Sequence, residues 1–338
     1  MRAFTIVEPG KTEIRDIAPP APRPDEVLVR VSVVGFCGSD LNTYRGRNPL
    51  VSYPRIPGHE IAGVIEAVGG QVPAEWRPGL PVTLSPYSNC GTCPACRQNR
   101  PNCCRNNQTL GVQRDGALTE RIAVPWRKLF TSSTLDMIQL AMVEPLTVGA
   151  HAADRGRVAA ADTVAVFGCG AIGLGAIAAA ASRQARVIAI DIDDGKLKLA
   201  AAAGAAVGVN TTRENLHERL QALTRGDGPD VIIEAVGLSQ TFRAAVEEVG
   251  FAGRVVYIGY AKQPVEYETK FFVQKELDIL GSRNASADNF LQVIAMLESG
   301  RLAVAELITH RVSLAQAGQA LREWDANPSA VTKIVVEV

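Results

Sequence analysis

The sequence predicts two domains: a β-rich domain and an α/β domain with a doubly wound parallel sheet. Its length of 338 residues exceeds that of one ordinary domain. The texture changes near residue 150, where short β-branched runs broken by Gly and Pro give way to alternating strand and helix patterns. Hydrophobic residues make up 47% and charged residues 21%, which is typical of a globular protein.

The first half is expected to form a compact β domain with loop excursions. Its predicted strands are β-branched runs bounded by turn residues, at 26–34, 60–68, 81–84 and 117–124. The first residues, Met1-Arg-Ala-Phe-Thr-Ile, are strand-like, and we expect no apolar targeting segment. We therefore expect a cytoplasmic protein with no membrane partner.

The second half alternates between strands and helices, which predicts parallel strands joined by crossover helices. Strands are expected at 163–167, 186–190, 231–235, 254–258 and 277–281, and helices at 171–184 and 196–203. Gly204 suits the end of the second of these helices. The remaining chain predicts a helix at 287–298, a strand near Leu307, a helix near Ala315 and a final strand at 333–338.

A glycine motif, Gly168-Cys-Gly170-Ala171-Ile172-Gly173, follows the first apolar strand of the second half and opens a helix. G-x-G-x-x-G is a weak signal alone, but this context is typical of dinucleotide binding. The glycines allow a tight turn, close approach of a pyrophosphate and close packing of helix on strand, and the helix N-terminus attracts phosphate. The alternative is a glycine-rich helix start that only packs on the sheet.

Asp191 ends the next strand, 18 residues after Gly173. A carboxylate there accepts hydrogen bonds from the ribose hydroxyls of NAD and repels the 2′-phosphate of NADP. The neighbours are Ile192, Asp193 and Asp194, and no arginine follows closely. We therefore expect NAD as the cofactor, with Lys196 on the following helix as a further contact.

Four cysteines lie within fifteen residues in the pattern Cys90-x2-Cys93-x2-Cys96-x7-Cys104. Short spacings of this kind supply the four soft ligands of a tetrahedral zinc ion, which would hold together a turn-rich lobe at about 88–106. Disulfide-linked or free thiols are the alternative, and a reducing compartment argues against disulfides. Spacing alone leaves Cys103 open as the fourth ligand in place of Cys104.

A second set of metal-type residues is spread over the first half, in Cys37-Gly-Ser39-Asp40, in Gly58-His59-Glu60-x2-Gly63-x5-Gly69-x2-Val72, and in Glu144-Pro145. Each string alone has an ordinary explanation, because a single cysteine is usually a small core residue and a His-Glu pair is usually surface polarity. Their joint occurrence indicates a second metal site.

With these strings the chain resembles the zinc-dependent medium-chain dehydrogenase/reductase family over nearly its whole length. The stretch from Gly58 to Val72 matches the family's zinc motif at every fixed position, and the cysteine lobe has the family's spacing with Cys104 as fourth ligand. Glu144-Pro145 is similar to the polyol, threonine and sugar-acid branch. The strings 281–284 and 309–311 resemble L-galactonate and L-gulonate 5-dehydrogenases.

The resemblance implies a GroES-like catalytic domain at 1–147 and 286–338, and a Rossmann NAD-binding domain at 148–285. It implies two zinc ions per chain, one catalytic and one structural. Cys37, His59 and Glu144 would ligate the catalytic zinc and leave one position open. Glu60 would lie beside the metal and enter its coordination as ligands exchange.

The resemblance also implies a proton path and a reaction. Asp40 would hydrogen-bond the second nitrogen of His59, and Ser39 would accept the proton of the substrate hydroxyl. The metal would acidify that hydroxyl while the carbon gives a hydride to NAD. Many relatives carry a histidine at the outer end of this relay, where this chain has Asn42, which takes no proton at neutral pH. The proton must then leave by another path, such as the cofactor ribose and water.

The expected substrate is a polyol or sugar acid, and Arg283, after a strand end of the parallel sheet, is a candidate contact for a carboxylate. The family suggests a homodimer or homotetramer. Lys plus Arg and Asp plus Glu are balanced at 35 each, which argues against a nucleic-acid-binding zinc ribbon. The metal-type residues argue against a zinc-free quinone reductase. A threonine, sorbitol or butanediol dehydrogenase and a non-catalytic NAD/zinc sensor remain alternatives.

Overall fold

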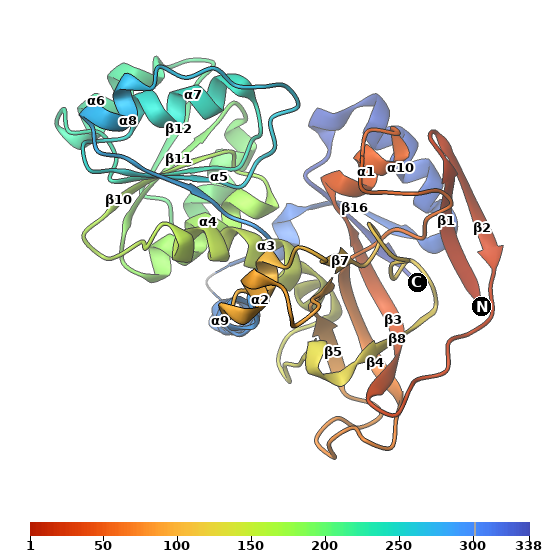
Figure 1. The fold of residues 1–338 in the computed structure, drawn as a ribbon. Coiled ribbons are helices and arrows are strands. Elements are labelled where there is room, and N and C mark those ends of the chain that lie inside the picture. Colours follow the sequence, from red (N-terminus) through yellow and green to blue (C-terminus); the bar gives the residue numbers. More distant parts are fainter. Residues whose placement is uncertain (301) are drawn as a thin grey trace. The chain divides into compact units, whose positions relative to one another are not determined.

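The computed structural model describes residues 1–300 and 302–338, which form two compact units. The first unit comprises residues 1–144 and 304–338, and the second comprises 145–303. Figure 1 shows the strands before residue 145 in red to yellow, the strands of the second unit in green to blue, and the last strands of the first unit in the dark blue of the C-terminal residues. The expected combination of a β-rich domain and a domain with a doubly wound parallel sheet is confirmed.

The first unit is built on a seven-stranded sheet in the order β16-β17-β3-β4-β5-β9, with β8 also paired to β3. These strands are β3 (Glu26–Phe36), β4 (Glu60–Val68), β5 (Pro81–Leu84), β8 (Arg121–Pro125), β9 (Leu129–Phe130), β16 (Ile308–Ser313) and β17 (Lys333–Glu337). A hairpin of β1 (Arg2–Glu8) and β2 (Lys11–Asp16) and a small pair, β6 (Tyr87–Ser88) and β7 (Gln108–Thr109), complete its strands among the described residues. Its helices are α1 (Gly38–Tyr44), α2 (Pro94–Arg97) and α10 (Ala317–Ala326).

The core of the first unit collects the inward side chains of these strands. Phe4, Phe36, Ile61 and Leu118 are fully or almost fully buried in it. The long β3 is central because β8 pairs with its first half, β17 with its last four residues and β4 with its other edge. The end of β3 is thereby enclosed on both edges, which makes it a rigid position for functional side chains.

The second unit carries a six-stranded, wholly parallel sheet in the order β12-β11-β10-β13-β14-β15. The strands are β10 (Thr163–Phe167), β11 (Arg186–Asp191), β12 (Val207–Asn210), β13 (Val231–Glu234), β14 (Arg254–Tyr257) and β15 (Asp278–Gly281). The helices are α4 (Ala171–Ser182), α5 (Asp194–Ala202), α6 (Leu216–Thr224), α7 (Ser239–Glu248), α8 (Lys270–Gln274) and α9 (Ala287–Glu298). In chain order this is 3-2-1-4-5-6, the doubly wound order whose switch point lies beside the first strand.

Two features of the helices differ from the sequence expectation. Helix α3 (Met137–Arg155) runs through Pro145, where the pattern suggested only a domain change. Helix α9 belongs to the second unit, although 286–303 was expected in the first domain. Asn289 explains the placement, because its amide donates to Asp154 Oδ2 at 2.6 Å and its Oδ1 lies 3.0 Å from His151 Nδ1.

The expected strand at 117–124 is also shorter, since β8 begins only at Arg121. Residues 117 and 118 instead donate their backbone N–H groups to the carbonyls of Gly58 and Pro57, at 3.0 and 3.1 Å. They thus brace the turn that leads into His59. Among the described residues, no helix has the length and hydropathy that crossing a bilayer requires.

Candidate metal centre and cofactor site

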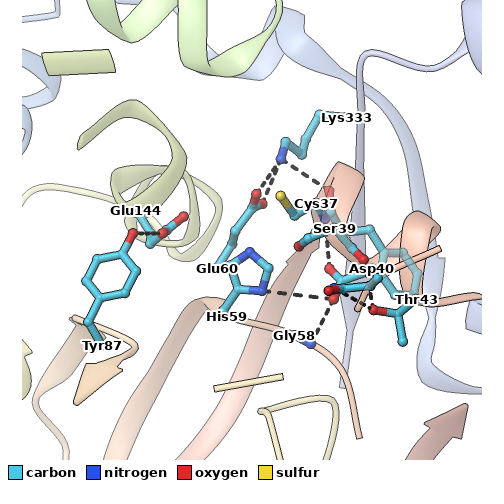
Figure 2. A network of polar contacts seen from close by, with 12 residues as sticks. Cys37, Ser39, Asp40, Thr43, Gly58, His59, Glu60, Tyr87, Glu144 and Lys333 are labelled. Atoms are coloured by element: carbon cyan, nitrogen blue, oxygen red, sulfur yellow. Dashed lines mark hydrogen bonds and ion pairs between the residues drawn. The ribbon is translucent and has the colours of Figure 1, made fainter. Parts of the chain in front are cut away.

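Three strand ends that are distant in sequence meet in the first unit. The register pairs Gly35 of β3 with Glu60 of β4, and Phe36 of β3 with Ile334 of β17. Cys37 follows at once as the N-cap of α1. The end of β3, the start of β4 and the start of β17 therefore place their side chains in one buried region (Figure 2).

Cys37, His59 and Glu60 form a group whose candidate ligand atoms all lie within 4.8 Å of one another. His59 and Glu60 are buried, and Cys37 is partly accessible. A thiolate, an imidazole and a carboxylate at this spacing suit a zinc ion. Gly35 leaves room for the carboxylate, since a Cβ there would lie 2.0 Å from Glu60 Oε2.

Glu144, from the middle of α3, is placed differently from the expected ligand set. It is buried, but it is not part of the group formed by Cys37, His59 and Glu60. The Tyr87 hydroxyl donates a hydrogen bond to Glu144 Oε1, as Figure 2 shows. Burial raises the pKa of the Glu144 carboxyl, against an opposing effect of His59. Tyr87 had no signal in the sequence beyond an aromatic residue shortly before the first lobe cysteine.

Asp40 connects the two loops that carry Cys37 and His59. Its carboxylate accepts from the backbone N–H of Cys37 at 2.9 Å and from that of Gly58 at 3.5 Å. The expected hydrogen bond to His59 is not formed, because Oδ1 lies 3.9 Å from His59 Nδ1. The interaction is an electrostatic contact, while the carboxylate serves the two backbone groups. Burial raises the pKa of Asp40, although the contact with His59 opposes this.

Ser39 lies in the first turn of α1, two residues after Cys37. Its Oγ is buried and has no hydrogen-bond partner among the described residues. The backbone here is fixed, since Thr43 Oγ1 donates to Ser39 O at 2.9 Å. A buried hydroxyl without a partner costs about 1–3 kcal/mol, so this oxygen is suited to a hydrogen bond with a ligand.

Lys333 is a site residue that the sequence reasoning missed. Its Nζ lies 2.7 Å from each oxygen of Glu60 and donates to Phe36 O at 3.2 Å. The side chain is 5% exposed and that of Glu60 is 1% exposed. The one available signal was a lysine within an otherwise β-branched C-terminal run, 331–336.

The charges of the site indicate a bound cation. Asp40, Glu60 and Glu144 are all buried carboxyl groups, and Cys37 adds a thiol. Lys333 supplies one positive charge to this cluster. Burying several acidic groups is costly unless cations or metals balance them. The residues therefore fit a divalent metal ion on electrostatic as well as ligand grounds.

The cysteine lobe brings together the four expected thiols, Cys90, Cys93, Cys96 and Cys104, with all Sγ atoms within 4.8 Å. Individual Sγ–Sγ distances are 3.5 Å for 93–96, 3.6 Å for 90–104 and 3.9 Å for 93–104. Cys103 is not in this group, and its Sγ faces the Arg100 guanidinium at 3.7 Å. The backbone N–H of Thr92 and that of Cys93 lower the pKa of the Cys90 thiol to about 5, which favours the metal-binding thiolate.

The glycine motif has the backbone that a dinucleotide requires. Gly168 adopts φ +90°, a conformation that side chains rarely tolerate. A Cβ on Gly173 would lie 1.8 Å from Gly168 O, so only glycine lets α4 approach the turn this closely. A Cβ on Gly170 would meet nothing within 4 Å, so this side of the turn is open. These residues fit a pyrophosphate at the start of α4.

Asp191 is anchored at the carboxyl end of β11. Its Oδ2 accepts from Cys169 N at 2.7 Å, and its Oδ1 accepts from Ile192 N at 2.7 Å and from Asp193 N at 3.1 Å. These bonds fix the carboxylate and leave it lone pairs for further donors. Lys196 lies one turn into α5, and Arg283 follows β15 and is exposed.

Two family profiles match the chain. The profile described as the alcohol dehydrogenase GroES-like domain matches residues 23–134, and that described as zinc-binding dehydrogenase matches residues 171–299. Together they cover most of both units. The matched ranges include every residue of the cysteine lobe, the 37–60 ligand segments and the glycine motif from Ala171 onward.

Individual proteins are similar over almost the full length. L-Galactonate-5-dehydrogenase of Escherichia coli is 31% identical over 296 residues, 88% of this chain and 87% of the relative. A solved alcohol dehydrogenase of E. coli in complex with NADH has a TM-score of 0.91 and 32% identity, covering 100% of this chain and 99% of its own. A zinc-binding dehydrogenase of Sinorhizobium meliloti bound to NADP has a TM-score of 0.91 and 30% identity, with the same coverage.

Proposed function

We propose that this chain, which belongs to the polyol branch of the zinc-dependent medium-chain dehydrogenase/reductase family, is a secondary-alcohol dehydrogenase. It would oxidise a secondary hydroxyl of a polyol or sugar acid to a ketone with NAD. The chain is thus an oxidoreductase acting on CH–OH donors. The observation that carries the proposal is the Ser39 hydroxyl, which is buried without a partner directly beside the metal-type group of Cys37 and His59.

Zinc when bound would polarise the substrate hydroxyl, and NAD when bound would accept the hydride. Cys37 and His59 would hold the metal together with Glu144 or Glu60. Asp40 keeps the loops of Cys37 and His59 in register through their backbone N–H groups. We assign the four lobe cysteines to a second, structural zinc.

Ser39 Oγ would take the proton from the substrate hydroxyl. Because its backbone carbonyl accepts from Thr43 Oγ1, the side chain is presented from a fixed helical turn. Asn42 lies one turn further on and its amide takes no proton, so the outward path would run through the cofactor ribose and water.

The cofactor would bind through Gly168, Gly170, Ala171, Ile172 and Gly173, with its ribose on Asp191. The anchored carboxylate supports NAD over NADP, because a 2′-phosphate beside it is repelled. We propose Lys196 as a further contact, since it lies one turn into the helix that follows Asp191.

The relative named for L-galactonate supports the choice of substrate class. We propose a sugar acid such as L-galactonate or L-gulonate, oxidised at C5. Arg283 is exposed after β15 and would bind its carboxylate in a two-pronged way.

The test is NADH formation over a panel of sugar acids, polyols, L-threonine and 2,3-butanediol. The proposal is supported if the highest kcat/KM is found with a sugar acid. Arg283→Ala should then lower that kcat/KM by increasing KM. If turnover instead favours uncharged polyols and is unchanged in Arg283→Ala, the protein is a dehydrogenase of the sorbitol or butanediol type. Binding of NAD and zinc without turnover of any compound would indicate a sensor.

We also propose a homo-oligomer. Strand β15 is an edge of the parallel sheet, and Ile279 on it is 41% exposed. Val273 on α8 is 81% exposed. Edge strands with exposed apolar side chains pair readily with another copy. Light scattering after chromatography would give a dimer or tetramer mass, and Ile279→Lys would lower it.

A further inference from the structure

Tyr87 links the base of the cysteine lobe to Glu144. It is the first residue of β6, three residues before Cys90. Its side chain is 7% exposed, and its hydroxyl donates to Glu144 Oε1. Figure 2 shows the ring beside Glu144, with the hydroxyl directed at the carboxylate.

The lobe is closed at its base by the strand pair that contains Tyr87. Tyr87 pairs with Thr109 and Ser88 pairs with Gln108. The Ser88 hydroxyl strengthens this base, because it donates to Gln108 O at 2.8 Å and accepts from Gln108 N at 3.1 Å. The intervening segment, 89–107, contains all four lobe cysteines.

This geometry makes the base sensitive to the lobe. A strand pair of two residues on each side is too short to hold a loop of this length by itself. Metal binding to four thiolates supplies folding free energy to such a segment. The flanks of β6 are also held by bonds from Leu110 N to Pro86 O at 3.1 Å and from Ser85 N to Lys128 O at 2.8 Å. A metal bound in the lobe would add a further restraint on β6, and with it on the position of the Tyr87 hydroxyl.

Glu144 needs such a fixed partner. Its carboxylate is buried outside the group of Cys37, His59 and Glu60, so its orientation decides whether it reaches a metal held there. Residues that hydrogen-bond a ligating carboxylate set its orientation and change metal affinity by about 10- to 100-fold. The Tyr87 hydroxyl donates to one of its two oxygens and so restrains the direction of the carboxylate.

We propose that Tyr87 is a positioning residue that fixes Glu144 toward the catalytic zinc and couples this ligand to metal occupancy of the cysteine lobe. The inference rests on the proposed catalytic zinc. It assigns the lobe a role in the chemistry in addition to its role in stability.

The first test is the affinity of the catalytic site for Zn²⁺, measured by competition with a chelator in the protein loaded with two zinc ions. Cys37→Ser identifies which ion is catalytic. Tyr87→Phe keeps the ring and removes the hydroxyl, and we expect it to lower the affinity of the catalytic site by about tenfold while the lobe ion binds as in the parent. Tyr53→Phe is the matched control, because Tyr53 donates to the backbone oxygen of Thr43, and its zinc affinities should equal those of the parent.

The second test is a double-mutant cycle that addresses the coupling. Ser88→Ala loosens the base without touching a metal ligand, and we expect it to weaken the catalytic site several-fold when Tyr87 is present. In the Tyr87→Phe background the same change should have no further effect. A second cycle combines Tyr87→Phe with Cys96→Ser, which empties the lobe of its metal. If Cys96→Ser does not fold, the cycle with Ser88→Ala alone tests the coupling.

The inference would be overturned if Tyr87→Phe bound zinc at the catalytic site as tightly as the parent does. It would also be overturned if Ser88→Ala weakened zinc binding by the same factor with and without the Tyr87 hydroxyl. If Cys37→Ser loses one zinc while Tyr87→Phe binds it as the parent does, only this inference fails. If Cys37→Ser leaves the zinc content unchanged, the proposed function fails, and the inference fails with it.

Discussion

Lys333 Nζ lies 2.7 Å from both oxygens of the Glu60 carboxylate, although the two residues are 273 positions apart in the chain. The first residue of the last strand thus neutralises the carboxylate nearest the Cys37–His59 pair. This ion pair holds the Glu60 side chain against Lys333 on β17. A glutamate released from Lys333 would compete for the metal.

Lys333→Met tests this pairing. Removing one partner of a buried ion pair leaves the other charge unpaired and costs about 3–5 kcal/mol, so we expect a large loss in urea unfolding free energy. Glu60→Gln combined with Lys333→Met should recover most of that loss, because no buried charge remains. The control is Arg121→Met, which breaks the exposed pair with Glu66 and should cost less than about 1 kcal/mol. If the losses of unfolding free energy in the two single variants added up in the double variant, Lys333 and Glu60 would not stabilise each other.

The roles of two motif glycines, Gly173 and Gly170, separate in alanine variants. Gly173→Ala places a methyl group against Gly168 O and should destabilise the protein by about 1–3 kcal/mol or more. Gly170→Ala meets no protein atom, so the unfolding midpoint should stay near that of the parent. Its methyl group would instead obstruct the pyrophosphate, and calorimetry should show weaker NAD binding. Unchanged NAD affinity in Gly170→Ala would contradict the placement of the cofactor.

Asp191 is expected to set the cofactor preference. Asp191→Ser with Ile192→Arg removes charge-assisted hydrogen bonds of about 1.5–3 kcal/mol, so kcat/KM with NAD should fall roughly 10- to 100-fold and the ratio of NADP to NAD should rise. Asp194→Ser is the control, since Asp194 is engaged by Arg213 and Asn210. Steady-state kinetics with both cofactors decide the matter, and equal ratios in the two variants would remove this role from Asp191.

The lobe metal can be tested with two neighbouring cysteines. Cys96→Ser removes one of four clustered thiols and should release one zinc per chain, with a fall in Tm of about 5 °C or more. Cys103→Ser should keep the full zinc content and Tm, because this thiol faces Arg100 instead. Zinc analysis and calorimetry on both proteins give the comparison. Loss of zinc in Cys103→Ser would reopen the choice of fourth ligand.

Local patterns explain which parts of the fold were predictable. Strands such as β4, β5 and β10 begin and end at the expected residues, because each is an apolar run bounded by turn residues. The glycine motif is likewise local. The course of α3 through Pro145 was missed because proline ordinarily ends a helix, and tertiary packing overrides that tendency here.

The site was only partly predictable for the opposite reason. The four lobe thiols come from one short segment, so spacing predicted a cluster there, and the resemblance to the family favoured Cys104 over Cys103 as its fourth member. Lys333 reaches Glu60, and Tyr87 reaches Glu144, through strand pairing and helix placement that no local pattern encodes. Glu144 lies on α3, outside the group formed by Cys37, His59 and Glu60, and no local pattern encodes that placement either.

The central claim is that Cys37 and His59 hold a catalytic zinc distinct from the lobe zinc. The most direct measurement is the zinc content of the purified protein and of His59→Ala, taken together with turnover of a sugar acid by the same preparations. We predict two zinc ions per chain in the parent, one in His59→Ala, and no detectable turnover in the variant. Two zinc ions and parent-like turnover in His59→Ala, or no zinc in the active parent, would contradict the account.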